Sequence, residues 1–405
     1  MSNPFENKRI LLGVTGSIAG YKACELASRL RQAGAFVDVV LTESAAKFIT
    51  PLSFESVTGR KAYTDKDLWG GEGHVLHVSL GQSADLILIA PATANTIAKL
   101  AHGIADNLLT DSVLVSICPL VFSPAMESHM YANAATQHNL HVLKERGALI
   151  LGPAEGHLAS GAVGKGRFVE PLNIMAELRW IMTRTGRLKD KKVVVTAGGT
   201  QEPIDPVRII SNNSSGKQGF ALAQSALDAG ADVILISAPN ALELPFGATQ
   251  VKVRTAAEMQ DAVLKACNKA DVLIMAAAVA DFRPQQPETQ KIKKGSGIPQ
   301  IKLEPTEDIL KGVAKNKTQT GHPLITVGFA AESQDLIDNA REKLAANSLD
   351  LIVANDITRS DSGFEVDTNT ITLIDKKGRS QSLPTLTKVE VADKVIDFVI
   401  HNLRL

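Results

Sequence analysis

Short, uninterrupted apolar runs recur along the chain, and most are followed by glycine or hydroxyl residues and then by a stretch whose apolar residues have helical spacing. Runs such as residues 85–90 (DLILIA) lack the alternation of a half-exposed strand, and they are typical of parallel strands buried on both faces. A strand that passes through a small turn into a helix is the repeating unit of an α/β fold. The pattern therefore predicts parallel sheets covered by helices.

The same pattern assigns a range to each predicted element. We expect strands at 8–14, 36–41, 85–90, 120–123, 193–195, 231–237, 271–280, 324–331 and 349–354, and a hairpin formed by 370–375 and 381–383. We expect helices within 16–34, from 45, after 96, within 176–182, from 220, at 255–269 and at 388–403. Two prolines, Pro203 and Pro206, are expected to hold the chain extended until a polar turn at 211–219.

The opening of a strand into a glycine turn occurs twice, at residues 9–20 and again at 193–219. A chain of 405 residues also exceeds what one hydrophobic core usually organises. A charged stretch without an apolar face, residues 183–192, separates the two halves. The sequence therefore predicts two tandem Rossmann-like parallel-sheet domains of the α/β class, residues 1–188 and 189–405.

Composition narrows the classes of partner. The chain has 43 basic and 43 acidic residues and only 4% aromatic residues, so no general basic field exists to hold a nucleic acid. Three scattered cysteines, Cys24, Cys118 and Cys267, give no disulfide framework and suit a reducing compartment. No apolar run reaches the roughly 18 residues of a membrane span, and no signal-peptide run precedes the first predicted strand. We expect a cytoplasmic protein without a membrane partner.

Small or hydroxyl residues follow three predicted strands of the first half, after residues 14, 41 and 90. Open parallel sheets bind ligands at such carboxyl ends, where free backbone N–H groups accept a phosphate. One tight turn with a glycine and a hydroxyl cap has an equally good structural explanation. Three such turns in one sheet favour a phosphate-bearing ligand.

His77 lies shortly before the third predicted strand. Taken alone, it is either a structural residue or a general base, because imidazole titrates near neutral pH. His74 precedes it by three residues, but the pair lacks a third ligand, and we predict no metal there. His138 and His141 share one face of a predicted helix and are expected to be exposed.

Four motifs of the first half resemble those of the flavin-containing cysteine decarboxylases, and they are residues 75–78 (VLHV), 91–96 (PATANT), 105–110 (ADNLLT) and 124–126 (PAM). The resemblance covers about residues 8–175, and it implies FMN at the strand ends in a site completed across a trimer interface. It makes His77 the active-site histidine, which takes the proton of the substrate thiol. It implies FMN contacts from Gly16, Ser17, Ile18, Thr42, Thr93 and Asn95.

Two residues depart from this family pattern. Glu127 stands where the family has an asparagine that holds the substrate carboxylate, so either burial and that carboxylate keep Glu127 protonated or its side chain faces away. Ser160 replaces the proton-donating cysteine of a glycine-rich segment, residues 157–167, that resembles the family's substrate-covering flap. Because a hydroxyl is a much weaker acid than a thiol, Ser160 is expected to relay a proton from water.

Small residues and charges also follow the predicted strands of the second half. Residues 276–278 (AAA) permit a flat base or a ribose to lie against the backbone, with Asp281 placed to read its polar groups. The turn at 212–217 (NNSSGK) begins a helix and forms an anion cradle, although it lacks the Walker A spacing. The run at 291–294 (KIKK) is either a solvated surface loop or a triphosphate contact.

Six motifs together resemble phosphopantothenate–cysteine ligase over about residues 190–403, and they are 196–208 (TAGGTQEPIDPVR), 211–219 (SNNSSGKQG), 276–282 (AAAVADF), 291–294 (KIKK), 328–332 (GFAAE) and 353–357 (VANDI). The resemblance implies CTP and Mg²⁺, with Asn212 handling the acyl-cytidylate and Lys291 the triphosphate. It implies further CTP contacts from Met275, Ala276, Ala277, Asp281, Glu307, Asp308, Ile309, Leu310, Phe329, Lys343 and Asn347. Glu307 replaces a proline and Asn347 a lysine of the family pattern, and the sequence assigns no metal ligand.

Together the two halves resemble the bifunctional coenzyme A biosynthesis family of bacteria. The resemblance implies that the second half joins cysteine to 4′-phosphopantothenate with CTP, and that the first half decarboxylates the product with FMN to 4′-phosphopantetheine. It also implies a homo-oligomer of trimeric flavoprotein cores and ligase dimers, which permits a dodecamer. Two alternatives remain open, a ligase with a degenerate flavoprotein domain and a flavin-binding regulatory protein of the phosphatase-inhibitor type.

Overall fold

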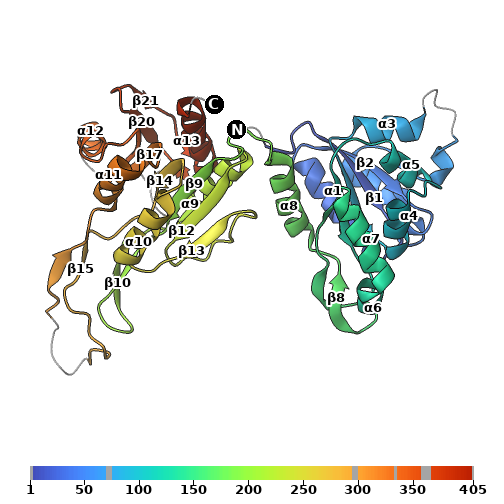
Figure 1. Cartoon of the computed structure of the whole chain (residues 1–405), viewed down its shortest axis with the longest axis horizontal. Coiled ribbons are helices and arrows are strands. Elements are labelled where there is room, and N and C mark those ends of the chain that lie inside the picture. Colours follow the sequence, from blue (N-terminus) through green and yellow to red (C-terminus); the bar gives the residue numbers. More distant parts are fainter. Residues whose placement is uncertain (1–2, 70–74, 294–299, 333–334, 357–365, 404–405) are drawn as a thin grey trace. The chain divides into compact units, whose positions relative to one another are not determined.

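The computed structural model describes residues 3–69, 75–293, 300–332, 335–356 and 366–403 (Figure 1). Three residues of the predicted motifs, His74, Lys294 and Ile357, lie outside the described residues. Contacts between Cα atoms divide the chain into a first unit, Ser2–Arg179, and a second unit, Trp180–Leu405. The two units are described separately below.

The described part of the first unit contains a six-stranded parallel sheet in the order β3-β2-β1-β4-β5-β6. Its strands are β1 (Arg9–Val14), β2 (Phe36–Leu41), β3 (Ala62–Tyr63), β4 (Leu86–Ala92), β5 (Leu120–Pro124) and β6 (Leu149–Ile150), and β7 (Ala154–His157) and β8 (Val163–Arg167) form a separate hairpin. Its helices are α1 (Gly20–Gln32), α2 (Pro51–Thr58), α3 (Leu76–Ser83), α4 (Ala94–His102), α5 (Leu108–Leu114), α6 (Ser128–Ala132), α7 (Ala134–Glu145) and the start of α8 (Pro171–Thr183), with 3-10 turns η1 (Ala45–Lys47) and η2 (Asp65–Asp67).

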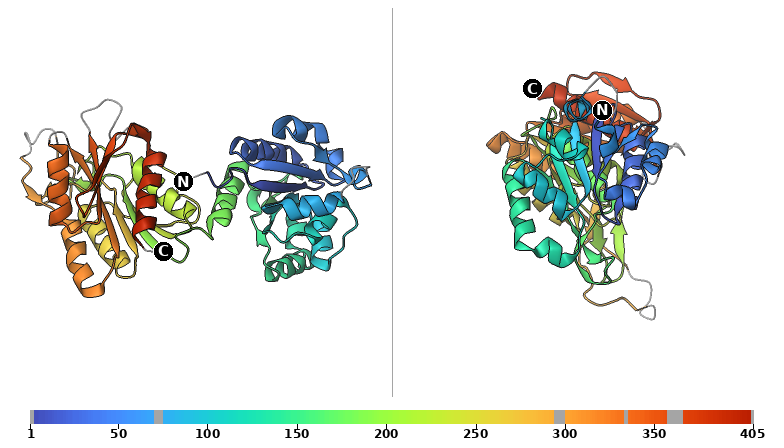
Figure 2. Two further views of the ribbon diagram at one scale, coloured as in Figure 1. Left: turned by 90° about the horizontal axis from the view of Figure 1, so that it is seen from above. Right: turned by 90° about the vertical axis from the view of Figure 1, so that its right-hand side faces the viewer.

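Helices cover both faces of this sheet (Figure 2), and apolar side chains on both faces are buried beneath them. Leu11 and Ile87 point to the face covered by α3, α4, α5 and α7. Their sequence neighbours Ile10 and Leu88 point to the other face and are also fully buried. Burial on both faces explains why these strands are continuous apolar runs in the sequence.

In the second unit, the described strands form an eight-stranded sheet in the order β13-β12-β9-β14-β17-β18-β20-β21. Its strands are β9 (Lys192–Ala197), β12 (Asp232–Ser237), β13 (Thr249–Lys252), β14 (Val272–Met275), β17 (Ile325–Glu332), β18 (Leu351–Asp356), β20 (Ile371–Asp375) and β21 (Ser380–Ser382). Three short two-stranded pairs lie outside it, β10 (Gln201–Pro203) with β11 (Ile209–Ser211), β15 (Phe282–Pro284) with β16 (Leu303–Pro305), and β19 (Thr368–Asn369) with β22 (Leu386–Thr387). The helices are α9 (Lys217–Asp228), α10 (Ala256–Cys267), α11 (Ile309–Thr320), α12 (Leu336–Ala346) and α13 (Lys388–Asn402).

The two sheets share one strand order. In each, the first strand lies in the middle, the next two strands follow on one side and the later strands on the other. Strands β9, β12, β13, β14, β17 and β18 are parallel, and β20 and β21 extend the sheet as antiparallel strands. This is the order of doubly wound nucleotide-binding sheets, whose strand order reverses beside the first strand. The prediction of two tandem Rossmann-like sheets is therefore confirmed.

Three predicted elements differ from the structure. The helix expected from residue 45 is only the turn η1, and the helix proper begins at Pro51, which suits the first helical turn. The strand expected at 271–280 ends at Met275, because the following backbone bonds to the hydroxyls of Thr196 on β9 and of Thr200 in the loop after β9. The extended segment after Pro203 is the β10–β11 hairpin, whose turn is held by the Asp205 carboxylate.

No helix within the described ranges is long and apolar enough to cross a membrane.

Candidate active sites

One buried threonine joins the ends of β1 and β4 in the first unit. Thr15 Oγ1 donates a hydrogen bond to the carbonyl oxygen of Pro91 (2.6 Å) and accepts one from the N–H of Thr93 (2.9 Å). Strands β1 and β4 flank the point where the strand order reverses. These two bonds therefore fix the backbone where sheets of this kind bind their ligands.

The loops that follow β1 and β2 meet at Gly16. A Cβ atom at this position would lie 2.5 Å from Ser44 Cβ, so only glycine permits this approach. Ser17 and the exposed Ile18 come next in the first loop. In the second loop, Thr42 Oγ1 accepts a backbone hydrogen bond from the start of η1 (3.3 Å). The structure thus brings together the residues that these two loops were predicted to contribute.

The start of α4 supplies the other two predicted flavin contacts. Thr93 caps the helix by accepting a hydrogen bond from its third N–H (3.4 Å), and Asn95 is exposed in the first turn. On the neighbouring strand β5, Ser123 has a fully buried Oγ without a hydrogen-bond partner in the described part of the chain. A buried hydroxyl without a partner is costly. The helix N-terminus, the hydroxyl groups and this orphaned atom fit a phosphate-bearing flavin at these strand ends.

Glu127 is ionised and caps a helix. Its carboxylate accepts hydrogen bonds from Ser128 Oγ (2.7 Å) and from the N–H groups of His129 (2.7 Å) and Met130 (3.3 Å). These bonds, together with one to the His129 ring (3.0 Å), lower the pKa of Glu127 to about 2. Of the two alternatives predicted for Glu127, the protonated carboxyl is therefore wrong, because the start of α6 supplies donors for the charged form.

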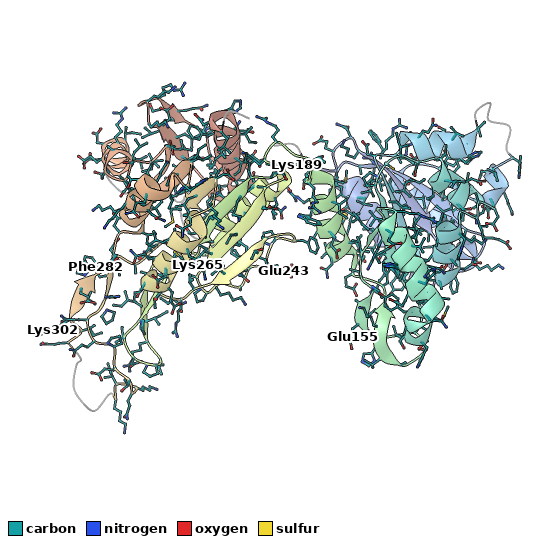
Figure 3. The ribbon with its side chains drawn as sticks, viewed as in Figure 1. Glu155, Lys189, Glu243, Lys265, Phe282 and Lys302 are labelled. Atoms are coloured by element: carbon teal, nitrogen blue, oxygen red, sulfur yellow. The ribbon has the colours of Figure 1, made fainter. Side chains whose placement is uncertain are left out.

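The hairpin of β7 and β8, residues 154–167, carries Ser160 and is called the flap below; Figure 3 labels Glu155 on it. Its base is fixed beside the Glu127 loop, where the N–H of Met126 donates to the carbonyl oxygen of Gly166 (3.0 Å). Ser160 lies in the exposed turn at the far end. The flap therefore ties Ser160 to the same loop as Glu127 through one short hairpin.

His77 lies in the first turn of α3 and is half-buried. The helix that carries it packs against α5 through Gly81. Two residues separate the end of α3 from the start of β4. His138 and His141 are exposed on α7, as predicted.

In the second unit, as in the first, a buried threonine hydroxyl bonds to the backbone at the end of a neighbouring strand. Thr196, near the end of β9, is fully buried, and its Oγ1 accepts hydrogen bonds from the N–H groups of Ala276 (3.1 Å) and Ala277 (3.1 Å). Thr200 Oγ1 likewise accepts from the N–H of Ala280 (2.9 Å). These two hydroxyls hold the backbone that follows β14 in place at the carboxyl ends of the strands.

The glycine pair Gly198–Gly199 allows the loop that carries Asn212 to lie directly against this backbone. A Cβ atom on Gly199 would lie 2.6 Å from the carbonyl oxygen of Asn212, so a side chain there would push the Asn212 loop away. Asn212 Nδ2 in turn donates to the carbonyl oxygen of Val279 (2.9 Å). The predicted catalytic asparagine therefore lies directly beside the small residues that follow β14.

These loops enclose a cavity of about 520 Å³ at the carboxyl ends of β14, β17 and β18. Among the residues that line it are most of those predicted to bind CTP, namely Asn212, Met275, Ala276, Ala277, Asp281, Glu307, Asp308, Ile309, Leu310, Phe329, Lys343 and Asn347. The volume lies within the range usual for small-molecule sites. Residues from five separate segments thus converge on one cavity.

Asn347 adds to the cavity a buried amide oxygen that lacks a hydrogen-bond partner within the described ranges. It is 5% exposed, and its Oδ1 has no hydrogen-bond partner among the described residues. Lys343 lies one helical turn earlier, where its Nζ donates to the carbonyl oxygen of Phe329 (3.4 Å). A ligand with a phosphate and polar groups would offset the charge of Lys343 and give the buried amide a hydrogen-bond partner.

Of the described residues predicted to bind CTP, Lys291 alone does not line this cavity. It lies on an arm of the second unit that also carries β15 and β16; Figure 3 labels Phe282 and Lys302 on this arm. The backbone beside Lys291 is clamped, because the N–H of Ile292 donates to Asp205 (3.1 Å) and its carbonyl oxygen accepts from Arg208 (3.2 Å). Several N–H donors and Arg208 lower the pKa of buried Asp205, so the clamp is charged.

Sequence reasoning missed residues that hold the sites rather than contact a ligand. Thr15 belongs to no quoted motif and Thr196 begins the motif at 196–208, but neither was assigned a role, and they share a strand-end position followed by small residues. Lys388 also lines the cavity, close to the predicted anion-cradle turn that contains Lys217, and its distance in the sequence hides this proximity. Within the described ranges, no group of three histidine, cysteine or carboxylate side chains is placed to hold a metal ion.

Comparisons with known proteins agree on both halves. Residues 1–181 match the family model Flavoprotein, and residues 188–403 match the model DNA/pantothenate metabolism flavoprotein C-terminal domain. The coenzyme A biosynthesis bifunctional protein CoaBC of Bacillus subtilis is 45% identical over 393 residues, which cover 96% of each chain. CoaBC of Vibrio cholerae is 43% identical over 394 residues, which cover 97% of this chain and 98% of the relative.

Among solved structures, the C-terminal domain of a CoaBC protein covers 54% of this chain and 99% of its own length, with 38% identity and a TM-score of 0.46. The relatives from Bacillus and Vibrio span both units of this chain at more than 40% identity. The chain therefore belongs to the family of coenzyme A biosynthesis bifunctional proteins CoaBC.

Proposed function

We propose that the chain catalyses two consecutive reactions of coenzyme A biosynthesis. Residues 189–405 join cysteine to 4′-phosphopantothenate with CTP, and residues 1–188 decarboxylate the product to 4′-phosphopantetheine with FMN. The observation that carries the proposal is the cavity of the second unit, whose walls contain twelve of the residues expected to act on CTP. The matching strand-end site of the first unit supports the second activity.

In the ligase reaction, CTP enters as its magnesium complex. The backbone of Ala276 and Ala277, held by Thr196, lies along the base and ribose, and Lys343 offsets phosphate charge. The substrate carboxylate attacks the α-phosphorus, pyrophosphate leaves, and Asn212 holds the resulting acyl-cytidylate beside Val279. The cysteine amine then attacks the acyl carbon and displaces CMP.

In the decarboxylation, FMN supplies the two-electron chemistry when it is bound at the ends of β1, β2 and β4. Gly16, Ser17, Thr42 and Thr93 hold its phosphate and ring, and His77 takes the proton of the substrate thiol. Glu127 stays ionised and holds the start of α6, so its role is to fix the loop whose Met126 N–H bonds to the base of the flap. Ser160, at the end of the flap, passes a proton from water to the product.

The active assembly is a homo-oligomer with flavoprotein trimers and ligase dimers. Lys291 lies outside the cavity of its own second unit within the described residues, on an arm with exposed apolar side chains such as Phe282 and Leu303. A second copy of the chain explains both features. It covers the exposed apolar side chains of the arm, and its own cavity takes up Lys291. Around the flavin loops, Ile18, Tyr21 and Phe48 are similarly exposed.

The experiment is a coupled assay on the full chain with 4′-phosphopantothenate, cysteine, CTP, Mg²⁺ and FMN. The proposal predicts equal amounts of CMP and CO₂ once both steps run. CMP without CO₂ favours a ligase with an inactive first unit, the second candidate, which the replacement at Ser160 supports. Neither product, with FMN bound, contradicts the proposal and favours a regulatory flavoprotein.

A further inference from the structure

An ion pair in the first unit joins α1 to the base of the flap. Residues 16–18, called the flavin loop below, lead into α1, and Lys22 lies in the first turn of this helix. Its Nζ donates to both carboxylate oxygens of Glu170 (2.7 and 2.9 Å), a residue 148 positions later in the chain. Because the Lys22 side chain is only 15% exposed, solvent screens this pair less than an ordinary surface pair.

Backbone hydrogen bonds connect the flavin loop directly to Lys22. The carbonyl oxygen of Ser17 accepts from the N–H of Gly20 (3.0 Å), and Ser17 Oγ accepts from the N–H of Ala19 (3.3 Å). The N–H of Lys22 donates in turn to the carbonyl oxygen of Ala19 (3.0 Å). A displacement of the flavin loop therefore displaces Lys22 as well.

Arg167 connects Glu170 to both strands of the flap. It is the last residue of β8, and its Nη2 donates to Glu170 Oε1 (2.7 Å). Its side chain lies against β7, because a Cβ atom on Gly156 would come within 3.2 Å of Arg167 Cδ and Nη1. The hydrogen bond from Lys22 is the largest influence on Glu170, and together with the charges of Lys22 and Arg167 it holds the pKa of Glu170 below its ordinary value.

The backbone of Glu170 is fixed by the body of the first unit. Phe168 and Val169, which precede it, are buried. The carbonyl oxygen of Glu170 accepts from the N–H groups of Asn173 (2.9 Å) and Ile174 (3.1 Å) at the start of α8. Glu170 is therefore anchored outside the flap, and its side chain reaches the flap on one side and α1 on the other.

One carboxylate thus accepts three hydrogen bonds from two cations on separate segments. Isolated surface ion pairs contribute little, whereas a network with good geometry can fix the position of its members. We propose that Glu170 is a positioning residue that sets the flap relative to the flavin loop, so that FMN binding and flap position are coupled. The inference rests on FMN as the proposed cofactor of the first unit. Because coupling is reciprocal, loss of the Glu170 carboxylate weakens FMN binding and the effect of FMN on the flap by the same factor.

The test follows the flap directly, because trypsin cleaves after Lys165, an exposed residue of β8. The full chain, either stripped of FMN or saturated with it, is digested, and cleavage after Lys165 is measured by mass spectrometry. In the wild type, FMN slows this cleavage by about fivefold, at the lower end of the usual coupling range because Glu170 is half exposed. In Glu170→Gln, the cleavage rate is the same with and without FMN, and the Kd for FMN rises by about fivefold. Lys22→Met has the same effect, and the double variant has no greater effect than either single one.

Glu25→Gln is the matched control, because Glu25 also lies on α1 but pairs with Arg29 of the same helix (2.8 Å). It leaves the protection by FMN unchanged, and equal melting temperatures without FMN show that the variants are folded. If Glu170→Gln is cleaved faster but is still protected about fivefold by FMN, Glu170 only stabilises the hairpin and the inference is overturned. Cleavage of the wild type that does not depend on FMN overturns it too, as does an unchanged Kd for FMN in Glu170→Gln. A wild-type chain that releases no CO₂ contradicts the proposed decarboxylation, whereas the proteolysis still decides whether FMN and the flap are coupled.

Discussion

The Thr196 hydroxyl is the support that most directly shapes the nucleotide cavity. It is fully buried, and its oxygen accepts from two successive N–H groups, those of Ala276 and Ala277, both at 3.1 Å. Thr196→Val preserves the shape of the side chain and removes the acceptor. Both N–H groups then lose their partner, at a cost of about 1–3 kcal/mol each when water cannot replace it. Because Ala276 and Ala277 line the cavity, water offsets part of this loss.

The expected change in the free energy of unfolding is therefore about 2–3 kcal/mol. For a unit of this size, each kcal/mol shifts the melting temperature by about 2–4 °C, which gives a decrease of roughly 4–12 °C. The loosened backbone also weakens CTP binding, so the KM for CTP rises. The first unit lacks this contact, and its flavin absorbance melts as in the wild type.

Scanning calorimetry of the full chain, read together with flavin absorbance, measures both effects in one sample. Thr196→Ser is the matched control, because it keeps the acceptor oxygen and loses only a methyl group. Thr15→Val makes the same change at the corresponding place in the first unit, where it destabilises the flavin-binding half instead. If Thr196→Val melts within about 1 °C of Thr196→Ser and binds CTP equally well, the supporting role of this hydroxyl is refuted.

Three further predictions concern the positions at which this chain departs from its family pattern. The pKa of Glu127 is about 2 in the folded chain against an ordinary value of 4.5. The stability that the charged carboxylate adds is therefore present above pH 4.5 and is lost as the pH falls toward 2. Glu127→Gln flattens this part of an acid-unfolding curve, and an unchanged curve contradicts the helix-cap role. Ser160→Cys places a stronger acid at the end of the flap and raises the rate of CO₂ release by about tenfold or more; equal rates mean that the proton comes from another group. Asn347→Lys adds a charge beside Lys343 and lowers the KM for CTP by about 3- to 10-fold in initial-rate assays; a higher KM shows that the buried amide itself contacts the nucleotide.

The sequence was most informative where burial is greatest. Strands such as β4 and β9 are continuous apolar runs, and the structure confirms them because both of their faces are covered. The ends of the strands were less predictable where hydrogen bonds to side chains replace the backbone hydrogen bonds between strands. The strand expected to reach residue 280 ends at Met275, since Thr196 and Thr200 take over the hydrogen bonds that a strand would make. Periodicity along the chain contains no information about such long-range bonds.

The candidate sites show the same division. Family membership, predicted from motifs on both halves, is confirmed by relatives that match almost the whole chain. The structure gathers most of the residues predicted to bind CTP around one cavity, although their individual roles stay predictions. Lys217 belongs to the turn predicted to cradle an anion, whereas Lys388 was not predicted, because only the packing of α9 against α13 brings it to the cavity. The ionised state of Glu127 also depends on hydrogen-bond donors at the start of α6, and no rule of residue spacing predicts these donors.

The central claim is that one chain holds two phosphate-binding strand-end sites, the first for a flavin and the second for a pyrimidine triphosphate. Equilibrium dialysis of the full chain against FMN and magnesium CTP together measures both at once. The account predicts one FMN and one CTP bound per chain, with neither ligand displacing the other. Absence of either ligand at saturating concentration, or competition between the two for a single site, contradicts it.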